Sequence, residues 1–318
     1  MNSDITLQIN LSAGDINYAD IMVRDLVSKH TEVKETLLIV DCCKPQRTKS
    51  IDPLIKYPEP EYSSKIKKIK NITNKLLQNE IVDNVYLIEQ GDPLLKKVAK
   101  KYINTLFSET HDAKGTPVLS YLLPLELITT RYMVHYDADM LLYQKEGCFW
   151  TLEAIKIMIE YDNAIFATPR VAPPFADLLN KEDATSLHEG PIPNPVKGGW
   201  LINWFSTRCF LIDNYKFNKL LPLMDTSIYL ELILRKIFQR SFPMATEMLL
   251  HKSLGKRGYR RLDLNSEDYW LLHPEEKDEK YISNLTKLLD YISRDEIPDE
   301  QRGWENMKSE IWENLLIM

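Results

Sequence analysis

The sequence predicts an α/β protein with a mixed, mostly parallel sheet flanked by helices and a helical extension at its C-terminus. Over residues 1–140, short apolar runs typical of strands alternate with segments whose apolar residues recur at helical spacing. Aspartates directly follow two of the apolar runs, at Asp41 and Asp137. Residues 277–318 have the spacing of amphipathic helices. Such alternation is typical of a sheet with helices on both faces.

Each element is predicted by a local pattern of this kind. Strands are expected at residues 5–11, 36–40, 85–88, 132–136, 164–168, 200–205 and 208–212. Helices are expected at residues 17–30, 65–78, 94–106, 124–130, 152–161, 229–238 and 247–256. A proline-rich segment at 169–199 is expected to be a long loop that forms a lid or a binding wall. Residues 275–318 are predicted to form two helices separated by Ile297 and Pro298.

Composition excludes several classes of protein. Of 318 residues, 44% are hydrophobic and 27% are charged, which is enough apolar material for a folded core. Forty basic against 46 acidic residues argue against a general nucleic-acid binder. The N-terminus lacks the basic region of a signal peptide, and no apolar run is long enough to span a membrane. Four cysteines without regular spacing favour reduced thiols and a cytoplasmic location.

Two aspartates follow the predicted strand 132–136. Asp137 ends the strand, and Asp139 lies just beyond it in the turn. Ligands of open α/β sheets bind beyond the carboxyl ends of the strands. Paired carboxylates there suit Mg²⁺ or Mn²⁺, which take oxygen ligands and keep positions open for phosphate. A surface turn is the alternative interpretation of so short a motif.

A second motif lies at residues 246–262. Glu247 opens the predicted helix 247–256, where the helix dipole favours an ionised carboxylate. An ionised carboxylate can act as a general base. The alternative interpretation is a plain capped helix.

Together, these two segments resemble a GT-A glycosyltransferase of the family-2-like kind, over roughly residues 5–275. Asp137 and Asp139 match its DxD motif. The helix that follows its xED motif is matched at Glu247, Leu250, Leu254, Gly258, Tyr259 and Arg260. Met248 stands where that motif usually has an aspartate, so Glu231 is kept as an alternative base.

The resemblance implies roles for further residues. Leu11 and Gly14 would lie against the nucleoside, and Asp41 would hold its base or ribose. Arg131 would face phosphate, unless it is a surface arginine. Nucleotide-sugar binding is thus expected at Leu11, Gly14, Asp41, Arg131, Asp137, Gly199 and Trp200, and metal binding at Asp137, Asp139 and His273. Core packing is the alternative for Trp200.

The resemblance also implies an activity and a domain organisation. The expected enzyme is a hexosyltransferase-type glycosyltransferase (EC 2.4) that uses Mn²⁺ or Mg²⁺, transfers from a UDP-sugar to a hydroxyl of a glycan or other acceptor, and inverts the anomeric carbon. Residues 1–276 would form the catalytic domain, with a nucleotide-binding half (1–140) and an acceptor half (141–276). The helices of 277–318 would pack on it. A nucleotidyltransferase and a non-catalytic nucleotide- or glycan-binding relative remain alternatives.

Overall fold

The computed structural model describes residues 4–103, 109–174, 194–238, 243–307 and 310–312. The strands are β1 (Ile5–Ser12), β2 (Glu35–Asp41), β3 (Asn84–Ile88), β4 (Tyr132–Asp137), β5 (Leu141–Gln144), β6 (Ala164–Thr168), β7 (Asn194–Val196), β8 (Gly199–Ile202), β9 (Cys209–Asp213), β10 (Arg260–Leu264), β11 (Tyr269–Pro274) and β12 (Asn306–Met307). The helices are α1 (Ala19–Lys29), α2 (Pro53–Lys56), α3 (Glu61–Gln78), α4 (Pro93–Ile103), α5 (Trp150–Glu160), α7 (Asn214–Asn218), α8 (Thr226–Ile237), α9 (Thr246–Leu254) and α10 (Glu279–Ser293).

One nine-stranded sheet organises the described part of the chain, in the order β3-β2-β1-β4-β9-β6-β10-β8-β7. Strands β3, β2, β1 and β4 are mutually parallel, whereas β9 runs antiparallel to both β4 and β6. A smaller sheet has the order β12-β11-β5. The α/β class predicted from the sequence is confirmed, with a parallel half followed by a mixed half.

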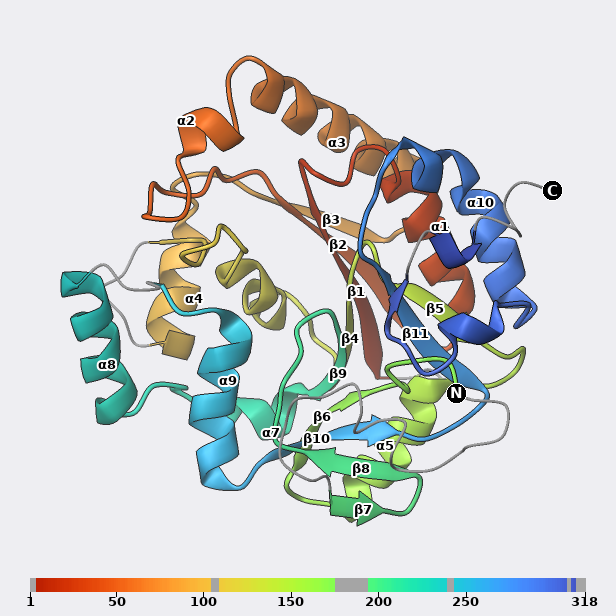
Figure 1. The fold of residues 1–318 in the computed structure, drawn as a ribbon. Helices are drawn as coiled ribbons and strands as arrows, with labels where there is room; N and C mark the ends of the chain where they lie inside the picture. Colours follow the sequence, from red (N-terminus) through yellow and green to blue (C-terminus); the bar gives the residue numbers. More distant parts are fainter. Residues whose placement is uncertain (1–3, 104–108, 175–193, 239–242, 308–309, 313–318) are drawn as a thin grey trace.

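Alternating side chains of the central strands supply a core on each face of the sheet. In β2, Leu38 and Val40 pack on one face, and Leu37 and Ile39 pack on the other. This is the period of two that a strand imposes, and it explains why apolar runs rather than alternating patterns mark the buried strands. Figure 1 shows α1, α3 and α10 on one side of the sheet and α4, α8 and α9 on the other.

The C-terminal segment differs in part from the two helices expected there. Helix α10 is present, but Asp299–Gln301 is a single 3₁₀ turn and β12 pairs with β11. Pro298 and Gly303, which has a φ of 82°, interrupt any longer helix. The expected helix at 124–130 is likewise only a 3₁₀ turn, Leu123–Glu126. Much of the predicted loop 169–199, and residues 313–318, lie outside the described residues.

Among the helices that the structure describes, none has both the length and the apolar character needed to cross a membrane.

Candidate active site

The order of the strands reverses at β1, and in open α/β sheets a crevice for ligands lies outside the strand ends at such a point. From β1 the chain first adds β2 and β3 on one side, and it then returns to place β4 on the other side of β1. Ligands of open α/β sheets bind at such a reversal, outside the carboxyl ends of the two strands. Here those ends are Ser12 of β1 and Asp137 of β4, because Asn10 is paired with Asp137 in the register of the two strands.

Asp137 is held by aromatic neighbours at the mouth of this crevice. The hydroxyl of Tyr121 donates to both carboxylate oxygens, at 3.2 and 3.1 Å. Nε2 of His135 lies 3.4 Å from Oδ1, and Nδ1 of the same ring is 2.5 Å from Gln8 Oε1. Burial raises the pKa of Asp137 above its ordinary value. The contacts with Tyr121 and His135 therefore fix the orientation of the Asp137 carboxyl group.

Asp139 has a different environment, because Lys277 and His273 lie beside it. Nε2 of His273 lies 3.7 Å from Oδ2, and the ammonium of Lys277 contacts the same oxygen. Burial would raise the pKa of Asp139, but His273 and Lys277 outweigh it and lower the pKa to about 2. Asp139 is thus ionised at neutral pH. The contact of Lys277 with Asp139 was not expected from the sequence. The signal that could have indicated it is the position of Lys277, four residues after His273.

The turn after β1 supplies a third carboxyl group, which was also not expected. Asp15 accepts hydrogen bonds from the backbone amide of Ser12 at 2.6 Å and from the Tyr18 hydroxyl. Burial raises its pKa to about 6 despite these bonds. Of the expected nucleoside contacts, Leu11 is buried in the core and Gly14 is exposed. Because the Leu11 side chain is buried and Gly14 has none, a ligand there could contact only the backbone of these two residues.

Asp41 ends β2, two strands away from Asp137. Its Oδ1 accepts from the Cys43 amide at 2.8 Å, and Nε2 of His111 lies 3.7 Å from Oδ2. Burial raises the pKa of Asp41 to about 6, and burial lowers the pKa of His111 to about 4.

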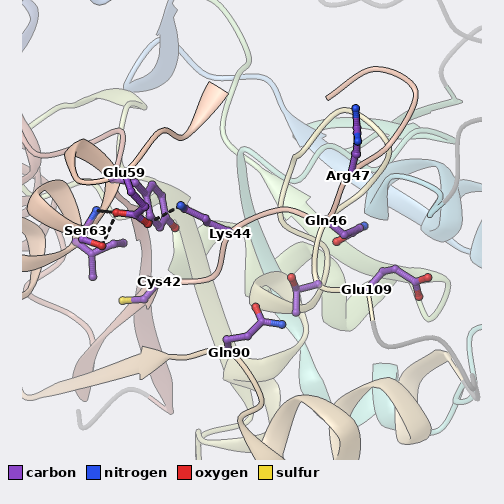
Figure 2. A pocket seen from close by; sticks show the side chains of 11 residues that line it. Cys42, Lys44, Gln46, Arg47, Glu59, Ser63, Gln90 and Glu109 are labelled. Carbon is purple, nitrogen blue, oxygen red and sulfur yellow. Dashed lines mark hydrogen bonds and ion pairs between the residues drawn. The ribbon is translucent and has the colours of Figure 1, made fainter. Parts of the chain in front are cut away.

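A groove of about 890 Å³ lies beyond the ends of β2 and β3. Figure 2 shows Glu59 on its wall between Lys44 and Ser63, and Glu59 oxygens lie 2.5 Å from Lys44 Nζ and 2.6 Å from Ser63 Oγ. Other charged side chains on the wall also have partners, since Arg47 pairs with Asp52. The lining thus combines paired charged side chains with uncharged donors and acceptors, which include Gln46, Ser63, Gln90 and Thr110.

Glu247 lies at the opposite side of the crevice, in the first turn of α9. Its Oε1 accepts from the amide and the hydroxyl of Thr207, at 3.0 and 3.3 Å. It lines a cavity of about 240 Å³ together with Met140, which follows Asp139 directly, and Arg208, whose carbonyl accepts from the Asp137 amide at 2.8 Å. The cavity thus adjoins the segment that carries Asp137 and Asp139.

The same cavity contains a buried guanidinium with an unused nitrogen. Arg261 is fully buried, and its Nε and Nη2 donate to the two oxygens of Asp263 at 2.6 and 2.8 Å. Its Nη1 is buried and has no hydrogen-bond partner in the described structure. A buried donor of this kind is costly to leave unpaired, so it is suited to a ligand oxygen.

Several expected site residues have structural surroundings instead. Arg131 precedes β4, at the end remote from Asp137, and pairs with Asp213 at 2.7 Å. A Cβ atom on Gly199 would lie 2.1 Å from the Asp263 carbonyl oxygen, so this glycine permits close packing of β8 on β10. Trp200 is buried beside Ile202, and it is Trp204 that lines the cavity.

The alternative base, Glu231, is also engaged elsewhere. Its Oε1 lies 2.5 Å from Lys252 Nζ and 2.9 Å from Arg235 Nη2. It does not line the cavity that contains Glu247.

A divalent cation was expected among Asp137, Asp139 and His273. Within the described residues, no group of three or more His, Cys, Asp or Glu side chains is placed to hold one. Asp139 and His273 fit two ligand positions by their chemistry, because an ionised carboxylate and an imidazole both bind Mn²⁺. Asp137 is not placed with them as a third ligand, and Tyr121 donates to both of its oxygens.

Comparisons with known proteins give distant structural likenesses. No family model and no curated protein matches the chain. A structure of GalNAc-T7 with UDP, GalNAc and Mn²⁺ aligns with a TM-score of 0.39 and 11% identity, over 85% of this chain and 43% of that one. An active-site mutant of LgtC aligns with a TM-score of 0.36 and 8% identity, over 81% and 72%. TarS from S. aureus aligns with a TM-score of 0.41 and 12% identity, over 91% of this chain and 39% of that one. This chain therefore spans less than half the length of GalNAc-T7 and of TarS.

Proposed function

We propose that this protein is a glycosyltransferase that moves a sugar, of the hexosyl type, from a nucleotide-diphospho-sugar to a hydroxyl acceptor. The observation that carries the proposal is that a candidate general base, Glu247, lies close to the carboxylates at the end of β4, where a donor diphosphate would bind. A carboxylate beside a cavity, Glu247, lies across Tyr121 and Arg208 from Asp137, and Asp139, two residues later, contacts the ammonium of Lys277. The motifs that contain Asp137, Asp139 and Glu247 support the same assignment.

The donor would bind along the carboxyl ends of β1, β2 and β4. Its diphosphate carries negative charge, and the ammonium of Lys277 lies at the end of β4 beside Asp139. Its nucleoside, UDP by default, would lie against the backbone of residues 11–14 and extend toward Asp41. The groove beyond β2 includes uncharged polar side chains such as Gln46, Gln90 and Thr110, which suit the hydrogen-bonding edges of a base and a ribose.

The proposed cofactor is Mn²⁺ or Mg²⁺, held by Asp139 and His273. When bound, such a cation acts as a Lewis acid that stabilises the charge on a departing diphosphate. Lys277 shares the same Asp139 oxygen, so the ammonium and the cation would compete for it.

The acceptor would enter the cavity beside Glu247. Glu247 would take the proton from the attacking hydroxyl, as a general base does. Thr207 holds that carboxylate through two hydrogen bonds, which fixes its direction. Nη1 of Arg261 would donate to a second oxygen of the acceptor. A single displacement from this side would invert the anomeric carbon.

Release of nucleotide from a panel of nucleotide-sugars, with water or a hydroxyl acceptor, tests the proposal. Glu247→Gln should lower transfer by about 10² to 10⁴-fold while the nucleotide affinity stays unchanged. Glu231→Gln is the matched control and should retain activity, because Glu231 is engaged with Lys252 and Arg235. Absence of nucleotide release from every donor would contradict the proposal, as would full activity in the Glu247 variant.

A further inference from the structure

Helix α8 presents large apolar side chains to solvent. Leu230, Leu234 and Ile237 are 55%, 53% and 66% exposed, and Phe238, which caps the helix, is 62% exposed. These four residues are called the outer face of α8. Figure 1 shows α8 at the periphery of the molecule, on the side of the sheet that also carries α4 and α9.

The outer face is a continuous stripe because of its helical spacing. Its residues stand at positions i, i+4, i+7 and i+8, which lie on one side of a helix. Ile228 and Leu232 anchor the opposite side in the core. The helix is therefore apolar on two sides, and its charged residues are confined to the flanks between them.

Basic side chains predominate around this helix. Arg235 and Lys236 lie on the flanks, and Lys252 of α9 is 2.5 Å from Glu231. Arg257 donates to the Leu220 carbonyl at 2.6 Å, which places the turn after α9 beside the N-terminal side of α8. Arg235 and Lys252 share Glu231, Lys236 pairs with Glu109, and Lys256 lies near Asp225, so with Arg257 these contacts hold five cations against three anions. The local charge is thus positive in a chain whose net charge is −6.

We propose that the outer face of α8 docks on an anionic lipid surface. Leucine, isoleucine and phenylalanine side chains would enter the boundary between headgroups and acyl chains. The surrounding lysines and arginines would lie at the level of the anionic headgroups. Apolar side chains with flanking cations are the pattern of helices that lie in a membrane interface.

A second copy of the chain fits this face less well. A two-fold interface would bring the basic flanks of one α8 against those of the other, and like charges in contact oppose association. The four exposed side chains offer on the order of 400 Å², whereas a stable protein interface takes about 800 Å² from each partner.

Co-sedimentation with vesicles tests the proposal. The full-length protein should bind vesicles of phosphatidylcholine with phosphatidylglycerol, bind pure phosphatidylcholine weakly, and lose binding as salt increases. The triple variant Leu234→Ser, Ile237→Ser and Phe238→Ser should lower the partition coefficient by about tenfold or more. Leu54→Ser with Ile55→Ser is the matched control and should bind normally, although these α2 residues are 78% and 81% exposed.

A second measurement addresses the location of the contact directly. In a Phe238→Trp variant, tryptophan emission should shift to shorter wavelength on addition of the anionic vesicles, and brominated lipid should quench it. The proposal would be overturned by absence of vesicle binding, by equal loss in the α2 control, or by unchanged emission. A concentration-dependent dimer in light scattering that the triple variant abolishes would also overturn it and assign the face to a second copy.

Discussion

The ammonium of Lys277 contacts Oδ2 of Asp139, the same oxygen that lies 3.7 Å from Nε2 of His273. Lys277 stands just before α10, so the C-terminal segment reaches back over the end of β4. Strand β11 brings His273 there through its antiparallel pairing with β5, which directly follows the Asp137–Asp139 turn. The C-terminal segment therefore controls the electrostatic environment of Asp139.

Removing that ammonium should make Asp139 a better ligand for a cation. We expect Lys277→Met to raise the affinity for Mn²⁺ by about tenfold, because one unit of competing positive charge is lost beside the carboxylate. Titration calorimetry with MnCl₂ alone measures this without any activity assay. Asp139→Asn should abolish the binding in either background. An unchanged or weaker affinity in the Lys277 variant would contradict the proposed position of the cation.

The unused nitrogen of Arg261 leads to a prediction about the acceptor. Arg261→Lys keeps a charge for Asp263 but loses the Nη1 donor, so the acceptor KM should rise by about tenfold or more. Release of nucleotide with water as acceptor should stay near the wild-type rate. Arg260→Lys is the matched control, since Arg260 donates to the carbonyls of Gly255 and Tyr259. Equal acceptor KM values in wild type and the Arg261 variant would contradict the role.

The buried strands could be predicted from the sequence because their apolar runs are local patterns. The predicted strand 164–168 coincides with β6, and 132–136 differs from β4 by one residue. Strands β5 and β11 were not predicted. Leu141–Gln144 and Tyr269–Pro274 form strands by pairing with each other, and this contact joins segments that lie far apart in the sequence.

The candidate site could be predicted only in part, for a similar reason. Asp137, Asp139 and Glu247 follow local signals, namely the end of a strand and the first turn of a helix. The contact of Lys277 with Asp139 and the unpaired Nη1 of Arg261 depend on tertiary packing. Arg131 was expected near phosphate, but it lies at the other end of its strand and pairs with Asp213.

Gly199 gives a prediction about stability. A Cβ atom there would lie 2.1 Å from the Asp263 carbonyl oxygen, and backbone atoms of a paired strand cannot move aside at low cost. We expect Gly199→Ala to lower the free energy of unfolding by about 1–3 kcal/mol or more. Gly14→Ala is the matched control, because its nearest atom is the flexible Ser12 hydroxyl at 3.5 Å. Urea unfolding measures both, and equal stability of the two variants would contradict the packing role.

Asp41 gives a prediction about pH. Burial raises its pKa from 3.8 to about 6, so the folded state binds more protons than the unfolded state between those values. Stability contributed by this group is therefore present at about pH 4 and is lost as the pH rises through about 6. Ionisation of Asp41 should cost about 3 kcal/mol above that range, since each pKa unit corresponds to about 1.4 kcal/mol.

Asp41→Asn removes the ionisation and keeps an oxygen for the Cys43 amide. The other groups that face this carboxyl, His111 and Tyr62, remain in both proteins. The variant should therefore be more stable than the wild type near pH 7, and the difference should shrink toward pH 4. Urea unfolding at a series of pH values measures the difference in free energy directly. A difference that stays constant, or that grows as the pH falls, would show that Asp41 is not held by burial in its protonated form.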